Sequence, residues 1–234
     1  MRGLRHSYYA MNVLVGGIPV REYAHQGKVY VEALMGRDFK IRLQNLSSRV
    51  LAVPTIDGLS VMDGKVASYN SSGYVLSAGQ IADIPGWRLN DREVAEFFFD
   101  QASRSYAAQM DKPTNVGVIG CAFFEEKRQE PIMYLGGGAR RGDELELLGT
   151  KSMGTERSAG TGFGRRTEHE VTAVSFERAS ATPICVLEIY YDFREGLEKR
   201  GIMVRYGVDP IPNAFPAESG PGCPPPSGWP GNRK

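Results

Sequence analysis

Short runs in which apolar and polar residues alternate are the feature that most restricts how this chain can fold. In residues 28–34 (KVYVEAL), Val29, Val31 and Ala33 fall on one face, and residues 38–44 (DFKIRLQ) repeat the pattern. A period of two is typical of a β-strand that is buried on one side. The sequence therefore predicts an all-β fold.

Turn signals between these runs set the expected connections. Residues 35–37 (MGR) predict a hairpin between the two runs. Residues 49–56 (RVLAVPTI) indicate a strand covered on both faces, and Pro54 places its end at an edge or bulge because proline cannot donate to a ladder. Asp57-Gly58 predicts a tight turn after the strand at residues 49–56.

Strand signals begin near Val20, and further strands are expected at residues 73–76, 80–84, 96–99, 115–125, 171–178 and 185–191.

One helix is expected near the end of the strand-forming region. Asp192 can cap residues 193–200, and Gly201 can end the helix in the left-handed conformation. The chain has 234 residues and is 41% hydrophobic, which is enough to bury a core without disulfides. We predict a single antiparallel β-sandwich or jelly-roll-like domain over residues 1–206.

Residues 135–166 break this rhythm with many glycines and end in GTERSAGTGFGRR (154–166). A phosphate-binding P-loop needs a strand followed by Gly-Lys-Ser/Thr at the start of a helix, and that order is not found here. We predict a long mobile loop or flap. The alternative is an anion-binding site, because Arg157, Arg165 and Arg166 could hold a carboxylate or phosphate beside glycine backbone.

Residues 207–234 are rich in proline and poor in periodic apolar residues. Such a segment cannot bury a core of its own, so we expect it to be disordered in isolation. The alternative is an extended arm that becomes ordered against a neighbouring protein, with Phe215 and Trp229 as partner-binding anchors.

Charge and cysteine content narrow the class of protein. A formal net charge of +1 gives no field that would attract nucleic acid or an anionic membrane. The amino terminus has no apolar stretch of signal-peptide length, and no window is long enough for a membrane span. Cys121, Cys185 and Cys223 are odd in number and widely spaced, which indicates reduced thiols. We expect a cytoplasmic protein; a virion or other particle released by lysis is also compatible.

Catalytic and metal-binding patterns are sparse. His169 lies between two glutamates, where a solvated charge cluster is expected and a catalytic base acting with Arg165 and Arg166 on an anionic substrate is the alternative. Cys121 and Cys185 lie in apolar strands, where thiols pack as small hydrophobes. The sequence has no HxH, HExxH or CxxC motif, so no metal or cofactor is predicted.

Aromatic residues near Trp87 raise the possibility of carbohydrate binding. Trp87 follows a Pro-Gly turn, and Tyr69 and Tyr74 precede it, so the three rings could form a stacking surface for a sugar. The other interpretation places Trp87 in the core, because tryptophan is heavily buried on average.

Two blocks resemble a set of bacterial β-rich proteins without an assigned function. The first runs from VLAVPTIDGLSVMDGKVAS through GYVL and IPGWR to NVGVIG, and the second combines GTGFGRR with FERASATP. The similarity covers residues 49–124 and 160–202. It implies that GTGFGRR is a regular feature of the fold, and it implies no catalytic residues.

These observations favour a non-enzymatic structural protein, a subunit that decorates or cements a larger particle such as a virion or filament. Its expected partners are copies of itself or other proteins. One alternative is a β-sandwich module that binds carbohydrate or another ligand. A second alternative is an enzyme that acts on an anionic substrate.

Overall fold

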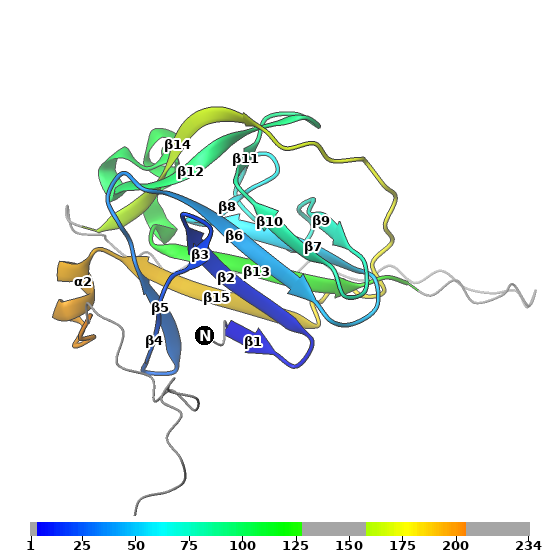
Figure 1. Cartoon of the computed structure of the whole chain (residues 1–234). Helices are drawn as coiled ribbons and strands as arrows, with labels where there is room; N and C mark the ends of the chain where they lie inside the picture. Colours follow the sequence, from blue (N-terminus) through cyan, green and yellow to red (C-terminus); the bar gives the residue numbers. More distant parts are fainter. Residues whose placement is uncertain (1–3, 128–157, 205–234) are drawn as a thin grey trace, which may run out of the picture. The chain divides into compact units, whose positions relative to one another are not determined.

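Two β-sheets packed face to face form the body of the protein (Figure 1). The computed structural model describes residues 4–127 and 158–204, so the predicted arm at 207–234 and most of the glycine-rich segment lie outside the described residues. The predicted β-sandwich is confirmed. Among the described helices, none is long and apolar enough to cross a bilayer.

Sheet A has eight strands. They are β1 (Leu4–His6), β2 (Tyr9–Val15), β3 (Ile18–Pro19), β6 (Asp38–Asn45), β10 (Ile81–Ile84), β11 (Gly86–Arg88), β12 (Glu93–Gln101) and β14 (Ala159–Glu168). The main path is β1-β2-β6-β12-β11, with β10 paired to β6, β14 to β12 and β3 to β2. Strands β1 to β3 precede the first strand signal at Val20, so the sequence prediction missed them.

Sheet B has seven strands. They are β4 (Glu22–His25), β5 (Lys28–Glu32), β7 (Val50–Ile56), β8 (Leu59–Ser60), β9 (Tyr74–Leu76), β13 (Val118–Glu125) and β15 (Cys185–Asp192). The order is β4-β5-β15-β13-β7-β8, with β9 paired to β7. The β5–β15 pair is parallel, and the other strand pairs of the described residues are antiparallel.

Pro54 lies where β7 has a gap in its ladder. On this side of β7, β9 pairs with residues 50–52 and β8 with residues 55–56. The Pro54 carbonyl accepts from Val61 N–H at 3.3 Å in this gap. The proline therefore removes no ladder hydrogen bond. The expectation of an edge or a bulge at Pro54 was wrong, because β7 is paired on both sides and its register with β13 is continuous through Pro54.

Residues 35–37 do not form the predicted hairpin, because β5 and β6 belong to different sheets. The chain crosses from sheet B to sheet A at this point, and Gly36 N–H donates to the carbonyl of Phe99 at 2.8 Å. Gly36 has a φ of 70°, a left-handed conformation that glycine adopts without strain. The alternating pattern identifies each strand but not the sheet that it joins.

The glycine-rich residues 159–166 belong to a strand, and the prediction of a loop was wrong for them. Strand β14 pairs with β12 from Glu93↔Glu168 to Gln101↔Ala159. A Cβ on Gly162 would lie 2.2 Å from the Phe98 ring, and one on Gly160 would lie 2.6 Å from Cβ of Ser105. The glycines therefore allow close packing rather than flexibility.

The predicted strand at residues 171–178 is also corrected. Residues 169–184, which we call the strap, run without a strand from β14 to β15 and make one isolated bridge, Glu126↔Arg178. Figure 1 shows the strap in yellow along one side of the sandwich. Residues 171–178 alternate as a strand would, but no neighbouring strand lies beside them to form a ladder.

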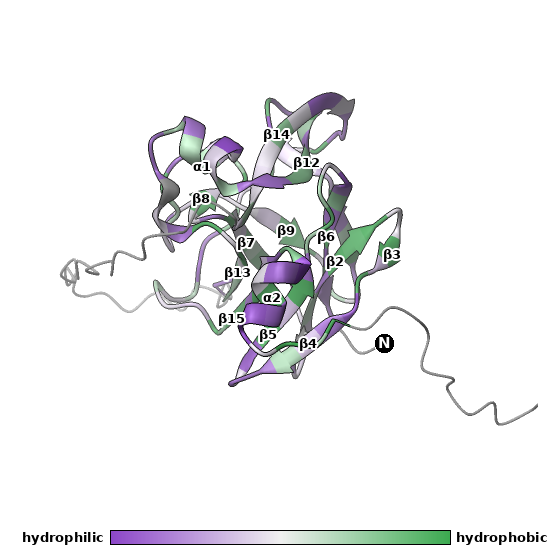
Figure 2. Cartoon of the chain, turned by 90° about the vertical axis from the view of Figure 1, so that its left-hand side faces the viewer, coloured by the Kyte–Doolittle hydropathy of each residue, from purple (hydrophilic) through white to green (hydrophobic). Residues whose placement is uncertain are grey.

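The predicted C-terminal helix is confirmed as α2 (Arg194–Lys199), and Gly201 follows it with a φ of 82°. Its predicted cap is wrong: the N-cap residue is Phe193, without a side-chain capping bond. The Asp192 carboxylate instead accepts from Phe193 N–H and from Ala159 N–H of β14. Figure 2 shows α2 in front of the sandwich with hydrophilic residues on its exposed turns.

Aromatic side chains fill the space between the sheets. Phe39 stacks on Phe97 and Phe99, with ring centroids 5.3 and 4.3 Å apart, and Tyr9 stacks on Phe123 at 4.6 Å. Stacked rings in this range add to the free energy gained by burying their area. The remaining described helical elements lie between β12 and β13: η1 (Ala102–Arg104), α1 (Tyr106–Gln109) and η2 (Pro113–Asn115).

Candidate functional site

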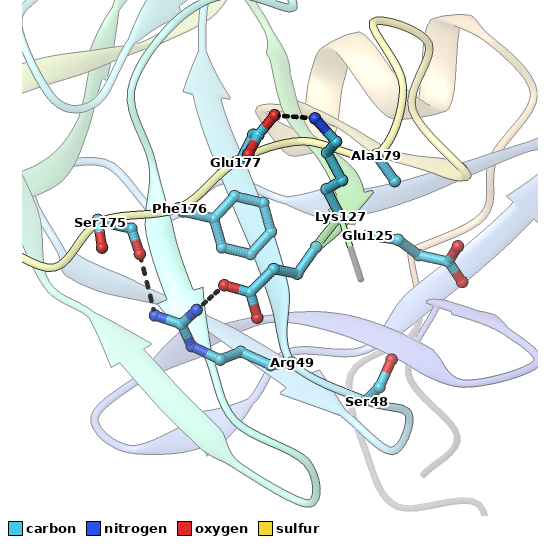
Figure 3. A pocket seen from close by; sticks show the side chains of 9 residues that line it. Ser48, Arg49, Glu125, Lys127, Ser175, Phe176, Glu177 and Ala179 are labelled. Carbon is cyan, nitrogen blue, oxygen red and sulfur yellow. Dashed lines mark hydrogen bonds and ion pairs between the residues drawn. The ribbon is translucent and has the colours of Figure 1, made fainter. Parts of the chain in front are cut away.

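A cavity of about 820 Å³ opens at one end of the sandwich, where β7 begins, β13 ends and the strap passes (Figure 3). Its lining residues are Ser48, Arg49, Glu125, Glu126, Lys127, Ser175, Phe176, Glu177 and Ala179. Backbone hydrogen bonds from Lys127 to Glu177 and from Ala179 to Glu125 join β13 to the strap there. The cavity walls thus come from three separate segments.

The charged groups of this cavity are mostly paired with one another. Arg49 pairs with Glu126 and also donates to the Ser175 carbonyl at 3.2 Å. Lys127 pairs with Glu177 (Figure 3). Glu125 also lines the cavity, and its carboxylate has no ion-pair partner among residues 4–127 and 158–204. The lining therefore carries one surplus negative charge.

Exposed apolar side chains lie at the same end of the sandwich. Tyr8 is 58% exposed and Leu46 50% exposed, and the Leu46 N–H donates to the Tyr8 carbonyl at 2.8 Å. Ile184 is 39% exposed and bonds through its N–H to the carbonyl of Phe123. We call these three residues and the cavity lining the cavity end.

A second polar cluster holds the start of the strap. Arg88 of β11 donates to the His169 carbonyl at 2.6 Å, and its other terminal nitrogen lies 2.6 Å from His169 Nδ1. The same guanidinium donates to the Tyr74 hydroxyl at 2.8 Å. Burial and the Arg88 charge lower the pKa of His169. The His169 Nδ1 therefore faces the Arg88 guanidinium, which can only donate.

A third cluster is buried between the sheets around Asp57, which is 1% exposed. Its carboxylate accepts from Gly117 N–H at 2.9 Å, Thr161 N–H at 3.0 Å and the Tyr191 hydroxyl at 2.6 Å. Burial raises the pKa of Asp57 to about 6, although these hydrogen bonds act in the opposite direction. The Tyr191 pKa is raised well above its ordinary value by burial and by Asp57.

Asp57 and Asp192 together serve the free edge of β14. Asp192 accepts from Ala159 N–H at 3.1 Å, and Asp57 accepts from Thr161 N–H two residues later. Alternate N–H groups of a strand point to the same edge, so these carboxylates occupy the position of a further strand. Their role in this arrangement is to fasten sheet A to sheet B.

The predicted anion-binding arginines face carboxylates of this chain. Arg165 pairs with Glu96 and lies 3.8 Å from Asp38, and Arg166 lies 3.6 Å from Glu93. His169 is held by Arg88, so it does not join them in an open site. Arg157 lies outside the described residues. Within the described part of the chain, these arginines do not form a convergent set of free cations.

The three rings of the predicted carbohydrate site are separated. Trp87 is 2% exposed, and its indole N–H donates to the Gly162 carbonyl at 3.1 Å. Tyr74 is engaged by Arg88, whereas Tyr69 is 51% exposed and meets Phe124 edge to face. Trp87 therefore belongs to the core, and a stacking surface built on it is not formed.

Other expectations concern metals, thiols and the arm. Residues 4–127 and 158–204 contain no group of three His, Cys, Asp or Glu side chains that could hold a metal ion. Cys121 and Cys185 are buried, and burial raises the pKa of both thiols. Phe215, Trp229 and Cys223 lie outside the described residues.

The sequence missed two central residues of these clusters. Asp57 is recognisable as a turn residue, but its partners Thr161 and Tyr191 lie 104 and 134 positions away. Arg88 gives no local signal, because its partner His169 is 81 positions away.

Comparisons of the chain with protein-family models, with curated proteins and with solved structures gave no match.

Proposed function

We propose that this protein is a non-catalytic subunit of a larger protein assembly and that it docks on a neighbouring protein through the cavity end. The observation that carries the proposal is the grouping of Tyr8, Leu46 and Ile184 at the end where the cavity opens. Exposed apolar side chains beside a concave polar surface are typical of protein interfaces.

The charges of the cavity indicate the chemistry of the partner. Arg49, Glu126, Lys127 and Glu177 neutralise one another in pairs, which leaves the Glu125 carboxylate for an external cation. A lysine or arginine of the docked protein would complement this carboxylate. The near-zero net charge of the chain also favours a protein partner over a nucleic acid.

The internal use of reactive groups supports a non-catalytic role. The His169 ring accepts from Arg88, and the Asp57 carboxylate is buried and accepts three hydrogen bonds. A general base needs a free lone pair within reach of a substrate proton. Both groups instead hold strands and the strap in place.

Sedimentation velocity over a range of concentrations tests self-assembly of the full-length chain. We expect Leu46→Glu and Ile184→Glu each to weaken association, because a carboxylate would be buried in the interface. Ile18→Glu is the matched control: Ile18 is 71% exposed and pairs with Val15 at the opposite end of β2 from Tyr9. Equal loss in all three variants, or none, contradicts a role for the cavity end.

Docking on a different protein needs a second measurement. A photo-crosslinking amino acid at position 46 should give discrete protein adducts in the cell of origin, whereas the same group at position 18 should not. A truncation ending at Tyr206 tests separately whether Phe215 and Trp229 contribute. A chain that is monomeric and gives no adducts from position 46 would refute the proposal.

A further inference from the structure

The two halves of the strap are held by different kinds of contact. Its second half is held by Phe176, which packs against the outer face of sheet B, and by backbone bonds at Glu177 and Ala179. Its first half is held by His169 N–H to the Arg92 carbonyl and Val171 N–H to the Asp91 carbonyl, both at 2.8 Å. The side-chain anchor of this first half is Arg88.

The contact between Arg88 and His169 fixes the protonation state of the imidazole. A guanidinium has only donors, so Nδ1 of His169 at 2.6 Å must be the acceptor and carries no proton. A neutral imidazole with a bare Nδ1 carries its single proton on Nε2. His169 is thus held as one neutral tautomer.

We propose that the contact between Arg88 and His169 is an acid-sensitive latch, which closes the first half of the strap when Nδ1 is bare and releases it when Nδ1 is protonated. A proton on Nδ1 would place an N–H against the guanidinium N–H and a second positive charge beside the first. Neither group can then accept from the other, and the two cations repel.

The groups that face His169 do not offset this repulsion. Arg88 has no carboxylate partner in the described part of the chain, and its Nε is buried without a hydrogen-bond partner there. From β6, Lys40 adds a further positive charge. From β10, the Asp83 carboxylate is already bonded to Arg42 at 2.6 and 2.8 Å.

The remaining neighbours of the ring are an uncharged phenol and two solvated carboxylates. Tyr74 of β9 meets the imidazole edge to face at 6.4 Å and is neutral. Burial raises the Tyr74 pKa further. Glu168 and Glu170 flank His169 in sequence and are exposed, so solvent screens their charges. Burial and Arg88 lower the His169 pKa, in agreement with the geometry.

Release would be local and would uncover a defined surface. The anchors at Phe176, Glu177 and Ala179 contain no histidine, so the second half of the strap stays in place. The freed part includes His169, which contacts Tyr74 and Arg88 at the end of β11, so the contacting faces of these two side chains would become accessible. This inference is independent of the proposed docking at the cavity end.

Nitrogen-15 NMR of the full-length protein tests the latch directly. At about pH 7.5 the His169 spectrum should show a bare Nδ1 and a protonated Nε2. The population of the open strap should rise roughly tenfold per pH unit below 6.5, until the pKa of the latched ring is reached. Faster exchange of the Val171 amide, corrected for the intrinsic effect of pH, should report the same change.

Two variants separate the latch from other titrations. His169→Asn keeps an acceptor near the Nδ1 position and cannot be protonated, so its Val171 amide should remain protected at about pH 5. Arg88→Met should expose that amide at both pH values. Acid-induced exchange that is the same in His169→Asn as in the parent chain, or a protonated Nδ1 at about pH 7.5, would overturn the proposal.

Discussion

The Tyr191 hydroxyl donates a 2.6 Å hydrogen bond to the buried carboxylate of Asp57. The same hydroxyl lies 2.7 Å from the Thr161 hydroxyl, so one side chain of sheet B contacts both the turn after β7 and strand β14. This contact is the centre of the polar connection between the two sheets.

Removing that hydroxyl should destabilise the fold. Tyr191→Phe leaves the Asp57 carboxylate with one donor fewer, and a hydrogen bond to a charged buried group contributes about 1.5–3 kcal/mol. Urea unfolding at about pH 7.5 measures the loss. The control is Tyr190→Phe, since the Tyr190 hydroxyl bonds to Glu188 at an exposed site, and we expect a change below about 0.5 kcal/mol. Equal losses in the two variants would show that the buried network has no special role.

Asp57 should make the fold more stable in mild acid. Its folded pKa of about 6 lies above the ordinary value of 3.8, so the folded state favours the protonated form. The resulting stabilisation is complete below 3.8 and disappears as the pH rises through about 6, with a total of about 3 kcal/mol. The free energy of unfolding of Asp57→Asn, measured from about pH 4 to 7.5, is the reference. A constant difference between the parent chain and this variant would contradict the raised pKa.

The pH effect of His169 has the opposite sign. Its folded pKa is lowered, so the stabilisation that it contributes is present above 6.5 and is lost as the pH falls through the folded pKa. Both the parent chain and Asp57→Asn contain His169, so its contribution cancels in the difference between their free energies of unfolding. That difference therefore reports the titration of Asp57.

Gly162→Ala should be destabilising through a single steric conflict. The new methyl group would lie 2.2 Å from the Phe98 ring, and overpacking of this kind costs about 1–3 kcal/mol. A double-mutant cycle with Phe98→Ala should recover most of this cost, because the smaller side chain leaves room for the methyl group. If the two changes are additive, the conflict lies elsewhere.

Fluorescence can test the burial of Trp87. The chain has two tryptophans, so Trp229→Phe leaves Trp87 as the single emitter. We expect a blue-shifted emission and weak quenching by acrylamide, because Trp87 is 2% exposed and packs against Phe97 and Tyr106. Strong quenching would contradict the burial of Trp87 and would make it a surface residue that could contact a sugar.

The sequence predicted the strands whose side chains alternate and failed where side chains carry no pattern. Strands β5 and β6 follow from Val29, Val31, Phe39 and Ile41, which all face the core. Strand β14 was missed because its glycines have no side chains to alternate. The strap was overpredicted because alternation shows what a segment could bury and not whether a neighbouring strand is there to pair with it.

The candidate site was less predictable than the fold. His169 was recognised as a residue between two glutamates, but its properties depend on Arg88, 81 positions earlier. Arg165 looked available because its carboxylate partner, Glu96, lies on another strand. Pairing of this kind depends on strand register, which local sequence does not specify.

The position of β15 between β5 and β13 has a consequence for the order of folding. β5 ends at Glu32, and its parallel neighbour does not begin until Cys185. During synthesis, the β4–β5 hairpin must wait for almost the whole domain to leave the ribosome before it gains its partner. A chain interrupted before residue 185 would leave two unconnected fragments of sheet B with open edges, which are prone to aggregation.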